Sequence, residues 1–140
     1  MIACIPVVGD VKATFERGKI ARNVYFVADI ANGGSHMGSI AVACYKPKPG
    51  CDAALIDLVR NHLPPLRTEG LITERTPIVM RTADGTIVEI FEWVSTNAIA
   101  GAHDNAIVLD LWKRFEAVCW YEAPSNLPEF QNMFQHFEAV

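Results

Sequence analysis

Apolar residues recur along this chain with two periods, and the changes of period mark its elements. A short apolar run over residues 40–45 predicts a buried strand, which two nearby prolines end. From Asp52 the apolar positions recur every three or four residues, which predicts a helix with one continuous apolar face. That face comprises Leu55, Leu58, Val59, His62, Leu63 and Leu66. Pro64 and Pro65 are expected to break or kink the helix, because prolines lack the amide donor, and Gly70 fits its end.

A β-hairpin is the clearest local prediction. Two β-prone runs, residues 77–81 and 86–93, flank Ala83-Asp84-Gly85, and Asp-Gly between such runs is a strong hairpin signal. The second run would carry Ile87, Glu89, Phe91 and Trp93 on one face and Val88, Ile90 and Glu92 on the other. Since neither face is polar throughout, both faces of this strand are expected to be covered.

A second helical region follows the hairpin. Ser95 or Asn97 can cap its start with a side-chain acceptor, and Asp104 with Asn105 is expected to interrupt it and allow a restart. The restarted helix has one apolar stripe of Val108, Leu111, Trp112, Phe115, Val118 and Cys119. A final short strand is predicted over residues 135–140, after prolines break regular structure over residues 124–128.

The predicted order is strand, helix, two-stranded hairpin, helix and strand. This order is that of the ferredoxin-like β-α-β-β-α-β arrangement, an α+β fold, and it assigns residues 37–140 to one domain. Helices on one face of the sheet would leave the other face open. Because that face is apolar too, pairing of the sheets of two copies is its simplest cover, which predicts a homodimer.

Residues 1–36 form an N-terminal extension with β-prone runs over residues 2–8, 11–15 and 24–30. Two origins are open for the segment that joins this extension to the domain. Gly34-Ser35-His36-Met37 resembles the remnant of a cleaved purification tag, which would make the extension vector-derived or part of an upstream reading frame. The alternative is a natural Gly/Ser loop.

Composition and charge narrow the classes of function. At 140 residues with a net charge of −4, the chain suits one buried core and argues against a nucleic-acid surface, which needs clustered cations. No apolar run approaches the length of a membrane span. The four cysteines form no C-x-x-C pair, so reduced thiols and a cytoplasmic location are expected. His62, His103 and His136 lack the close spacing of a metal site, and no metal or cofactor is predicted.

Three segments resemble the dimeric α+β barrel superfamily, in its antibiotic-biosynthesis-monooxygenase-like branch. They are Tyr45-Lys46-Pro47-Lys48-Pro49-Gly50, the hairpin that ends in Glu92-Trp93, and residues 98–103 followed by Trp112-Lys113-Arg114-Phe115. The resemblance covers residues 39–140. It implies a homodimer whose two sheets form a barrel, with a small-molecule cavity between the sheet and the helices of each subunit. Activities in the superfamily include cofactor-free oxygenation of aromatic polyketides, haem degradation and small isomerase or lyase reactions.

The haem-degrading branch is a poor match. It carries an Asn on the first strand and, on the second helix, a Trp and a His ten residues apart. Here the first strand has no Asn, His103 stands where that Trp would fall, and Trp112 and Lys113 stand near the place of the His. These departures argue against haem binding.

The candidate catalytic residues are His103, Glu89 and Glu92. His103 could act as a general base, because imidazole exchanges protons near neutral pH, or it could serve the helix break beside it. At least one of the two glutamates is expected in a covered region, where a carboxyl group becomes a candidate for proton transfer. The alternative is a salt bridge to Arg81 or Arg114.

The candidate substrate-binding residues are Trp93, Trp112, Phe115, Tyr45 and His62. Trp93, Trp112 and Phe115 could form an aromatic wall for a flat substrate, or they could simply belong to the core. Two functions remain open. One is an enzyme, such as a cofactor-independent monooxygenase, that removes a proton from an aromatic or enolisable molecule. The other is a non-catalytic ligand-binding or structural dimer.

Overall fold

The computed structural model describes residues 38–140. Within that range the chain forms a mixed α+β fold around one five-stranded antiparallel sheet with the strand order β4-β1-β3-β2-β5. The strands are β1 (Ser39–Pro47), β2 (Ile78–Arg81), β3 (Ile87–Trp93), β4 (Cys119–Glu122) and β5 (Glu138–Ala139). The predicted N-terminal extension with its β-prone runs and the segment at residues 34–37 lie outside the described residues.

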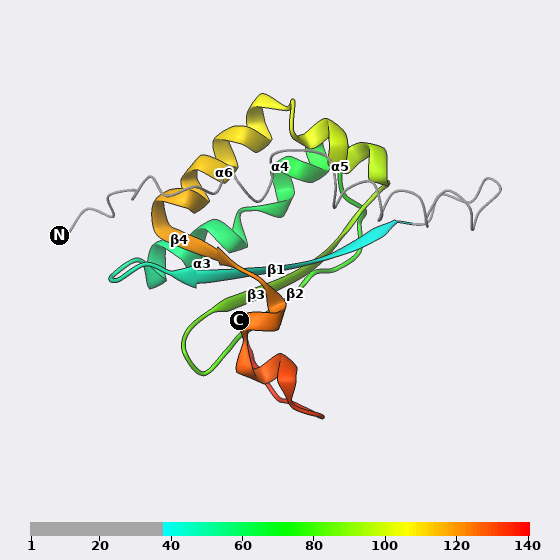
Figure 1. The fold of residues 1–140 in the computed structure, drawn as a ribbon. Helices are drawn as coiled ribbons and strands as arrows, with labels where there is room; N and C mark the ends of the chain where they lie inside the picture. Colours follow the sequence, from blue (N-terminus) through cyan, green and yellow to red (C-terminus); the bar gives the residue numbers. More distant parts are fainter. Residues whose placement is uncertain (1–37) are drawn as a thin grey trace.

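The helices cover one face of the sheet (Figure 1). They are α3 (Asp52–Arg60), α4 (Leu63–Thr68), α5 (Thr96–Ala102) and α6 (Ala106–Val118). The 3₁₀ turns η1 (Pro124–Asn126) and η2 (Pro128–Gln131) belong to the C-terminal segment, which lies on the opposite side of the sheet in Figure 1. Within residues 38–140, the α-helices therefore cover one face of the sheet and leave the other without a helical layer.

The first predicted helix is divided, as its two prolines suggested, but the division lies just before them. α3 ends at Arg60, and Asn61 and His62 separate it from α4. Pro64 and Pro65 lie in the first turn of α4, where backbone amides have no partner within the helix and a missing donor costs little. The break turns His62 into the residue that joins the two helices.

The second helical region is also divided where the sequence indicated. The Ser95 hydroxyl accepts a hydrogen bond from the Ala98 amide and caps α5. The Asn105 side-chain oxygen accepts from the amides of Ile107 and Val108 and caps α6. Both caps satisfy amides that the first turn of a helix leaves without partners.

The predicted last strand over residues 135–140 is wrong in extent and place. The strand that directly follows α6 is β4, which pairs with β1, whereas only Glu138–Ala139 of the C-terminal segment forms a strand, at the β2 edge. Cys119 continued the apolar stripe of α6 and so was assigned to that helix. Pairing with the free edge of β1 outweighs this local pattern, and the aromatic residues Trp120 and Tyr121 suit a strand.

The two faces of β3 differ in what covers them. Ile87, Glu89, Phe91 and Trp93 are all buried on the helix side, where two apolar clusters hold most of the core. On the other face Leu127 covers Cys44 and Val88. Beyond Leu127 this face stays exposed, with relative accessibilities of 53% at Ile40, 41% at Val42 and 58% at Ile78. We call these last three residues the open face.

The hairpin confirms the Asp-Gly prediction and carries a testable pH effect. Asp84 accepts hydrogen bonds from the Thr82 hydroxyl and the Thr86 amide, and Gly85 adopts φ +90°. The contacts with Thr82 and Thr86 hold the pKa of Asp84 below its ordinary value of 3.8. A carboxyl group with a lowered pKa stabilises the fold above its ordinary pKa and loses that contribution as the pH falls toward the folded-state pKa.

Asp84→Asn is therefore expected to flatten the fall in stability of the wild-type protein below about pH 4. Urea unfolding of both proteins between pH 2 and pH 6 measures this effect. Parallel pH profiles for the two proteins would contradict the assignment.

Candidate functional site

The most unusual polar group in the core is the carboxyl group of Glu89, which has no solvent exposure. Its Oε2 atom accepts a hydrogen bond of 3.0 Å from the Tyr45 hydroxyl and lies 2.8 Å from Nδ1 of His62. Tyr45 and His62 are themselves only 3% and 4% exposed. We call these three residues the Glu89 cluster.

Three separate elements bring the cluster together. Glu89 lies in the middle of β3 and faces the helices, between Ala43 of β1 and Val79 of β2. Tyr45 lies two residues further along β1 on the same face, and the α3–α4 joint supplies His62 from above the sheet.

Aromatic rings enclose the cluster. The His62 ring makes edge contacts with Phe115 of α6 and Phe91 of β3, with centroids 5.0 and 5.7 Å apart. Tyr45 packs against Phe115 at 4.8 Å and against Tyr121 at 5.9 Å. Because these rings exclude water, each polar contact of Glu89 acts in a medium of low dielectric constant, where electrostatic interactions are stronger.

The hydroxyl group of Tyr45 remains a proton donor at neutral pH. Burial above all, and then the charge of Glu89 and the hydrogen bond to it, raise the pKa of Tyr45 well above its ordinary value of 10.0. With a proton on Nδ1, His62 donates to the same carboxylate oxygen. Glu89 Oε2 is thus an acceptor for two donors.

The other carboxylate oxygen, Oε1, is buried and has no hydrogen-bond partner among the described residues. A buried acceptor without a donor costs about 1–3 kcal/mol. An oxygen in this state can accept a proton or a hydrogen bond from a molecule that enters the site. Oε1 is therefore the atom of the cluster that can accept a proton or a hydrogen bond from a ligand.

The structure therefore brings together four of the sequence-predicted residues: Glu89, Tyr45, His62 and Phe115. The sequence named each of them but did not connect them, since Arg81 and Arg114 were the partners considered for the glutamates. Those arginines pair instead with Glu138 and Asp110. Three polar side chains on apolar faces, one from each of three elements, are the pattern that could have connected the cluster.

Glu92 lies on the opposite face of β3 from Glu89. Its Oε2 accepts from Arg75 Nε at 2.8 Å and from the Thr73 hydroxyl at 2.9 Å. The Arg75 hydrogen bond, followed by that from Thr73, lowers the pKa of Glu92 below its ordinary value. The Glu92 carboxylate forms a salt bridge with Arg75. A salt bridge was one of the predicted alternatives, but Arg81 and Arg114 were the predicted partners.

The remaining predicted residues lie around the neighbouring core cluster. Trp93 packs against Phe91 with centroids 5.5 Å apart. His103 follows the last residue of α5, and its ring contacts that of Trp112 at 5.0 Å. Trp93 and Trp112 belong to one apolar cluster, while Tyr45 and Phe115 belong to the other. The structure thus places His103 beside Trp112. The hydrogen-bond contacts of Glu89 come from Tyr45 and His62 instead.

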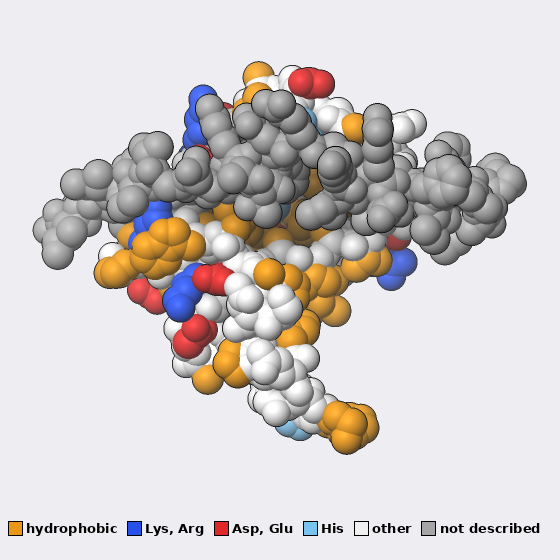
Figure 2. Space-filling view, in the orientation of Figure 1, with side chains coloured by type: hydrophobic (Ala, Val, Ile, Leu, Met, Phe, Trp, Pro, Cys, Tyr) orange, Lys and Arg blue, Asp and Glu red, His pale blue; other side chains and the backbone are white. Residues whose placement is uncertain are grey.

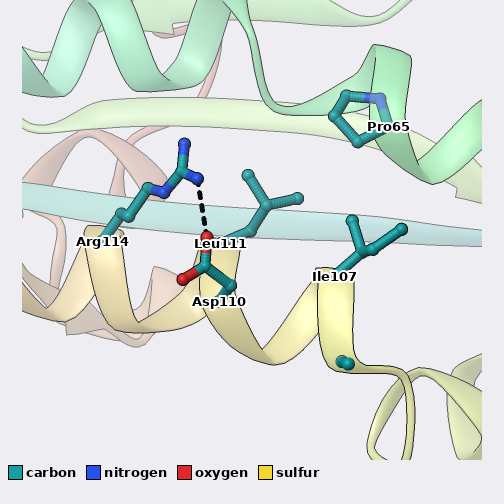
Figure 3. Close-up of a pocket in the computed structure, with 6 residues that line it drawn as sticks. Pro65, Ile107, Asp110, Leu111 and Arg114 are labelled. Atoms are coloured by element: carbon teal, nitrogen blue, oxygen red, sulfur yellow. Dashed lines mark ion pairs between the residues drawn. The ribbon is translucent and has the colours of Figure 1, made fainter.

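A groove of about 350 Å³ lies between α4 and α6 (Figure 3). Pro65, Ile107 and Leu111 supply apolar surface, and an Asp110–Arg114 ion pair of 2.6 Å lies at its side. A smaller pocket of about 100 Å³ lies between α3 and the hairpin end. None of the residues of the Glu89 cluster lines either space. A molecule reaches Glu89 only after covering side chains move.

No group of three or more His, Cys, Asp or Glu side chains within residues 38–140 is arranged to hold a metal ion. None of the helices in the same range is long and apolar enough to cross a membrane.

Comparison with known proteins adds no relative. No family model, no curated protein and no solved structure matches this chain.

Proposed function

We propose that this protein binds a small, flat molecule that carries an acidic proton, and that Glu89 accepts that proton. The observation that carries the proposal is the buried, unpartnered Oε1 of Glu89 beside an Oε2 that already accepts from two donors. A buried carboxylate positioned in this way is a suitable general base. The aromatic rings around it suit the faces and edges of a flat substrate.

The substrate class follows from the charges around Glu89. Its recorded polar contacts come from Tyr45 and His62, and no lysine or arginine is among them. An anionic substrate would be repelled by the carboxylate, whereas a neutral phenol or enol offers the O–H that Oε1 lacks. In the oxygenase form of the proposal the resulting carbanion is the reductant and dioxygen the co-substrate, so no bound cofactor takes part.

We also propose the dimeric α+β barrel as the assembly. The order β4-β1-β3-β2, with the helices on one face, is the strand order of a ferredoxin-like domain and supports this assignment. The exposed apolar side chains of the open face support a second copy of this chain as their cover. On this account the barrel positions two Glu89 clusters, one in each subunit.

The exclusion of solvent from the Glu89 cluster favours one alternative. In that alternative the protein is a non-catalytic ligand-binding or structural dimer, and the cluster specifies how the core packs. Its members are at most 4% exposed and are surrounded by closely spaced rings. A binder would take up a ligand without accelerating any proton transfer.

A pair of probes tests the binding step. 2-Naphthol offers an O–H to Glu89, and 2-methoxynaphthalene has nearly the same shape without the proton. We expect ligand-observed NMR to give at least tenfold tighter binding of 2-naphthol to the wild-type protein, since hydrogen bonds to charged groups contribute about 1.5–3 kcal/mol. Glu89→Gln should abolish the preference, because Tyr45 and His62 attract the amide oxygen and leave the amide NH₂ facing the ligand hydroxyl.

Glu92→Gln is the matched control, since Glu92 lies on the other face of the same strand. It should keep the preference for 2-naphthol. Equal affinities of the wild-type protein for the two probes, or an unchanged preference in Glu89→Gln, would refute the proposal.

A further inference from the structure

Between η2 and β5 the C-terminal segment exposes two apolar residues that the rest of the chain does not cover. Met133 is 86% exposed and Phe134 is 91% exposed, whereas large apolar side chains are normally buried. Phe134 also has φ +56°, a left-handed backbone conformation that side chains other than glycine seldom adopt. Figure 2 shows apolar side chains gathered at the end of the projecting segment. We call Met133 and Phe134 the tip.

The segment that carries the tip is fixed at both ends. Leu127 is buried against Cys44 and Val88 on one side, and the Ala83 amide donates to Glu129. At the far end β5 pairs with β2. Between these anchors the rings of Phe130 and Phe137 pack together with centroids 5.6 Å apart. The tip is therefore held in position rather than left on a loose chain end.

The C-terminal segment that carries the tip lies on the side of the sheet away from the helices (Figure 1), and the open face is turned to that same side. If two sheets face one another, a segment that projects from that side of one subunit must run beside or over the other subunit. The open face and the tip are two of the exposed apolar surfaces of the described residues. They are then available to each other in both copies, because a twofold interface presents each surface twice.

The area of the sheet face that carries the open face gives an independent reason to expect a further contact between two copies, in addition to the contact of their sheets. The four strands β4, β1, β3 and β2, which are four to nine residues long, measure roughly 400 Å² as a flat footprint. Leu127 already covers part of it. A stable interface buries roughly 800 Å² on each partner. A buried aromatic side chain at the tip would add about 150–250 Å² of accessible area to the interface.

We propose that the tip of each subunit docks on the open face of a second copy of this chain. The contact places Met133 and Phe134 of one subunit against Ile40, Val42 and Ile78 of the partner copy. This inference rests on the proposed dimer and specifies which segment completes it.

Sedimentation equilibrium of four proteins tests this contact. They are the wild-type protein, the tip variant Met133→Ser/Phe134→Ser, the sheet variant Ile40→Asp and the control variant Ile107→Ser. Ile107 is 47% exposed on α6, on the helix side of the sheet, and so matches the apolar character of the tip without sharing its position. We expect a wild-type dimer, a dissociation constant raised at least a hundredfold in the tip and sheet variants, and a change under threefold in the control.

A crosslinking experiment identifies the partner surface directly. A benzophenone-bearing phenylalanine replaces Phe134, and equal amounts of ¹⁵N-labelled and unlabelled protein are mixed before illumination. We expect mixed-isotope crosslinks that map to strand β1 or β2. Circular dichroism of each variant checks that the fold is intact.

The outcomes separate the two proposals. A wild-type dimer that the tip variant leaves unchanged, with crosslinks only inside one chain, overturns the tip contact and leaves the dimer standing. A wild-type protein that stays monomeric at 500 µM overturns both, because another partner must then cover these surfaces. Neither result bears on whether Glu89 binds 2-naphthol.

Discussion

His62→Leu is expected to lower the free energy of unfolding by about 1.5–3 kcal/mol, because it removes a hydrogen-bond partner from a buried carboxylate. Glu89 has no solvent exposure, and His62 and Tyr45 are its recorded partners. Water cannot replace the lost contact without opening the core. Leucine keeps much of the volume of the imidazole ring, so the loss measures the broken polar contact more than a cavity.

The double variant Glu89→Leu/His62→Leu provides the control within the cluster. Replacement of both partners of a buried hydrogen bond by apolar groups of similar shape can be nearly neutral, so the double variant should be more stable than His62→Leu alone. Urea unfolding at pH 7 measures all three proteins. A loss below 1 kcal/mol for His62→Leu, or an additive loss in the double variant, would contradict the cluster described above.

Local patterns predicted much of the fold. The two-residue period of residues 86–93 assigned Glu89 and Glu92 to opposite faces, and the structure confirms this because side chains alternate strictly along a strand. The capping residues Ser95 and Asn105 also mark helix starts that the structure contains. These features depend on residues that are close in sequence, so they can be predicted from the sequence alone.

Features that depend on distant parts of the chain were less predictable. β4 becomes a strand because the edge of β1 is free to pair with it, and no local signal separates Cys119 from the stripe of α6. The joint at His62 lies before the prolines because a helix tolerates prolines in its first turn. Predicting either position requires knowledge of the packed structure.

In the candidate site, too, the single residues could be predicted from local patterns, but their arrangement in space could not. Tyr45, His62, Phe115 and Glu89 were each identified from their place on an apolar face. Their convergence depends on the register of β1 with β3 and on the angle of the α3–α4 joint, which periodicity does not specify. His103 was a candidate base because imidazole exchanges protons near neutral pH, whereas the structure places its ring against Trp112.

Glu89→Gln is expected to slow proton transfer at least a hundredfold, which is the lower end of the contribution of a general base. Glutamine keeps the size of glutamate and can still accept from Tyr45 and His62 through its amide oxygen. It cannot accept a proton at neutral pH. The fold should therefore survive while the reaction is lost, which separates a catalytic role of Glu89 from a structural one.

The most direct measurement is the rate of deuterium incorporation at C1 of 2-tetralone in D₂O, followed by ¹H NMR. 2-Tetralone carries a flat aromatic ring and is enolisable, and the exchange needs only a base that removes the C1 proton and returns a deuteron. The account predicts that the wild-type protein and Glu92→Gln accelerate the exchange to within threefold of each other, and that Glu89→Gln loses at least a hundredfold. Equal exchange rates for wild type and Glu89→Gln, or an equal loss in both glutamate variants, would contradict the assignment of Glu89 as the base.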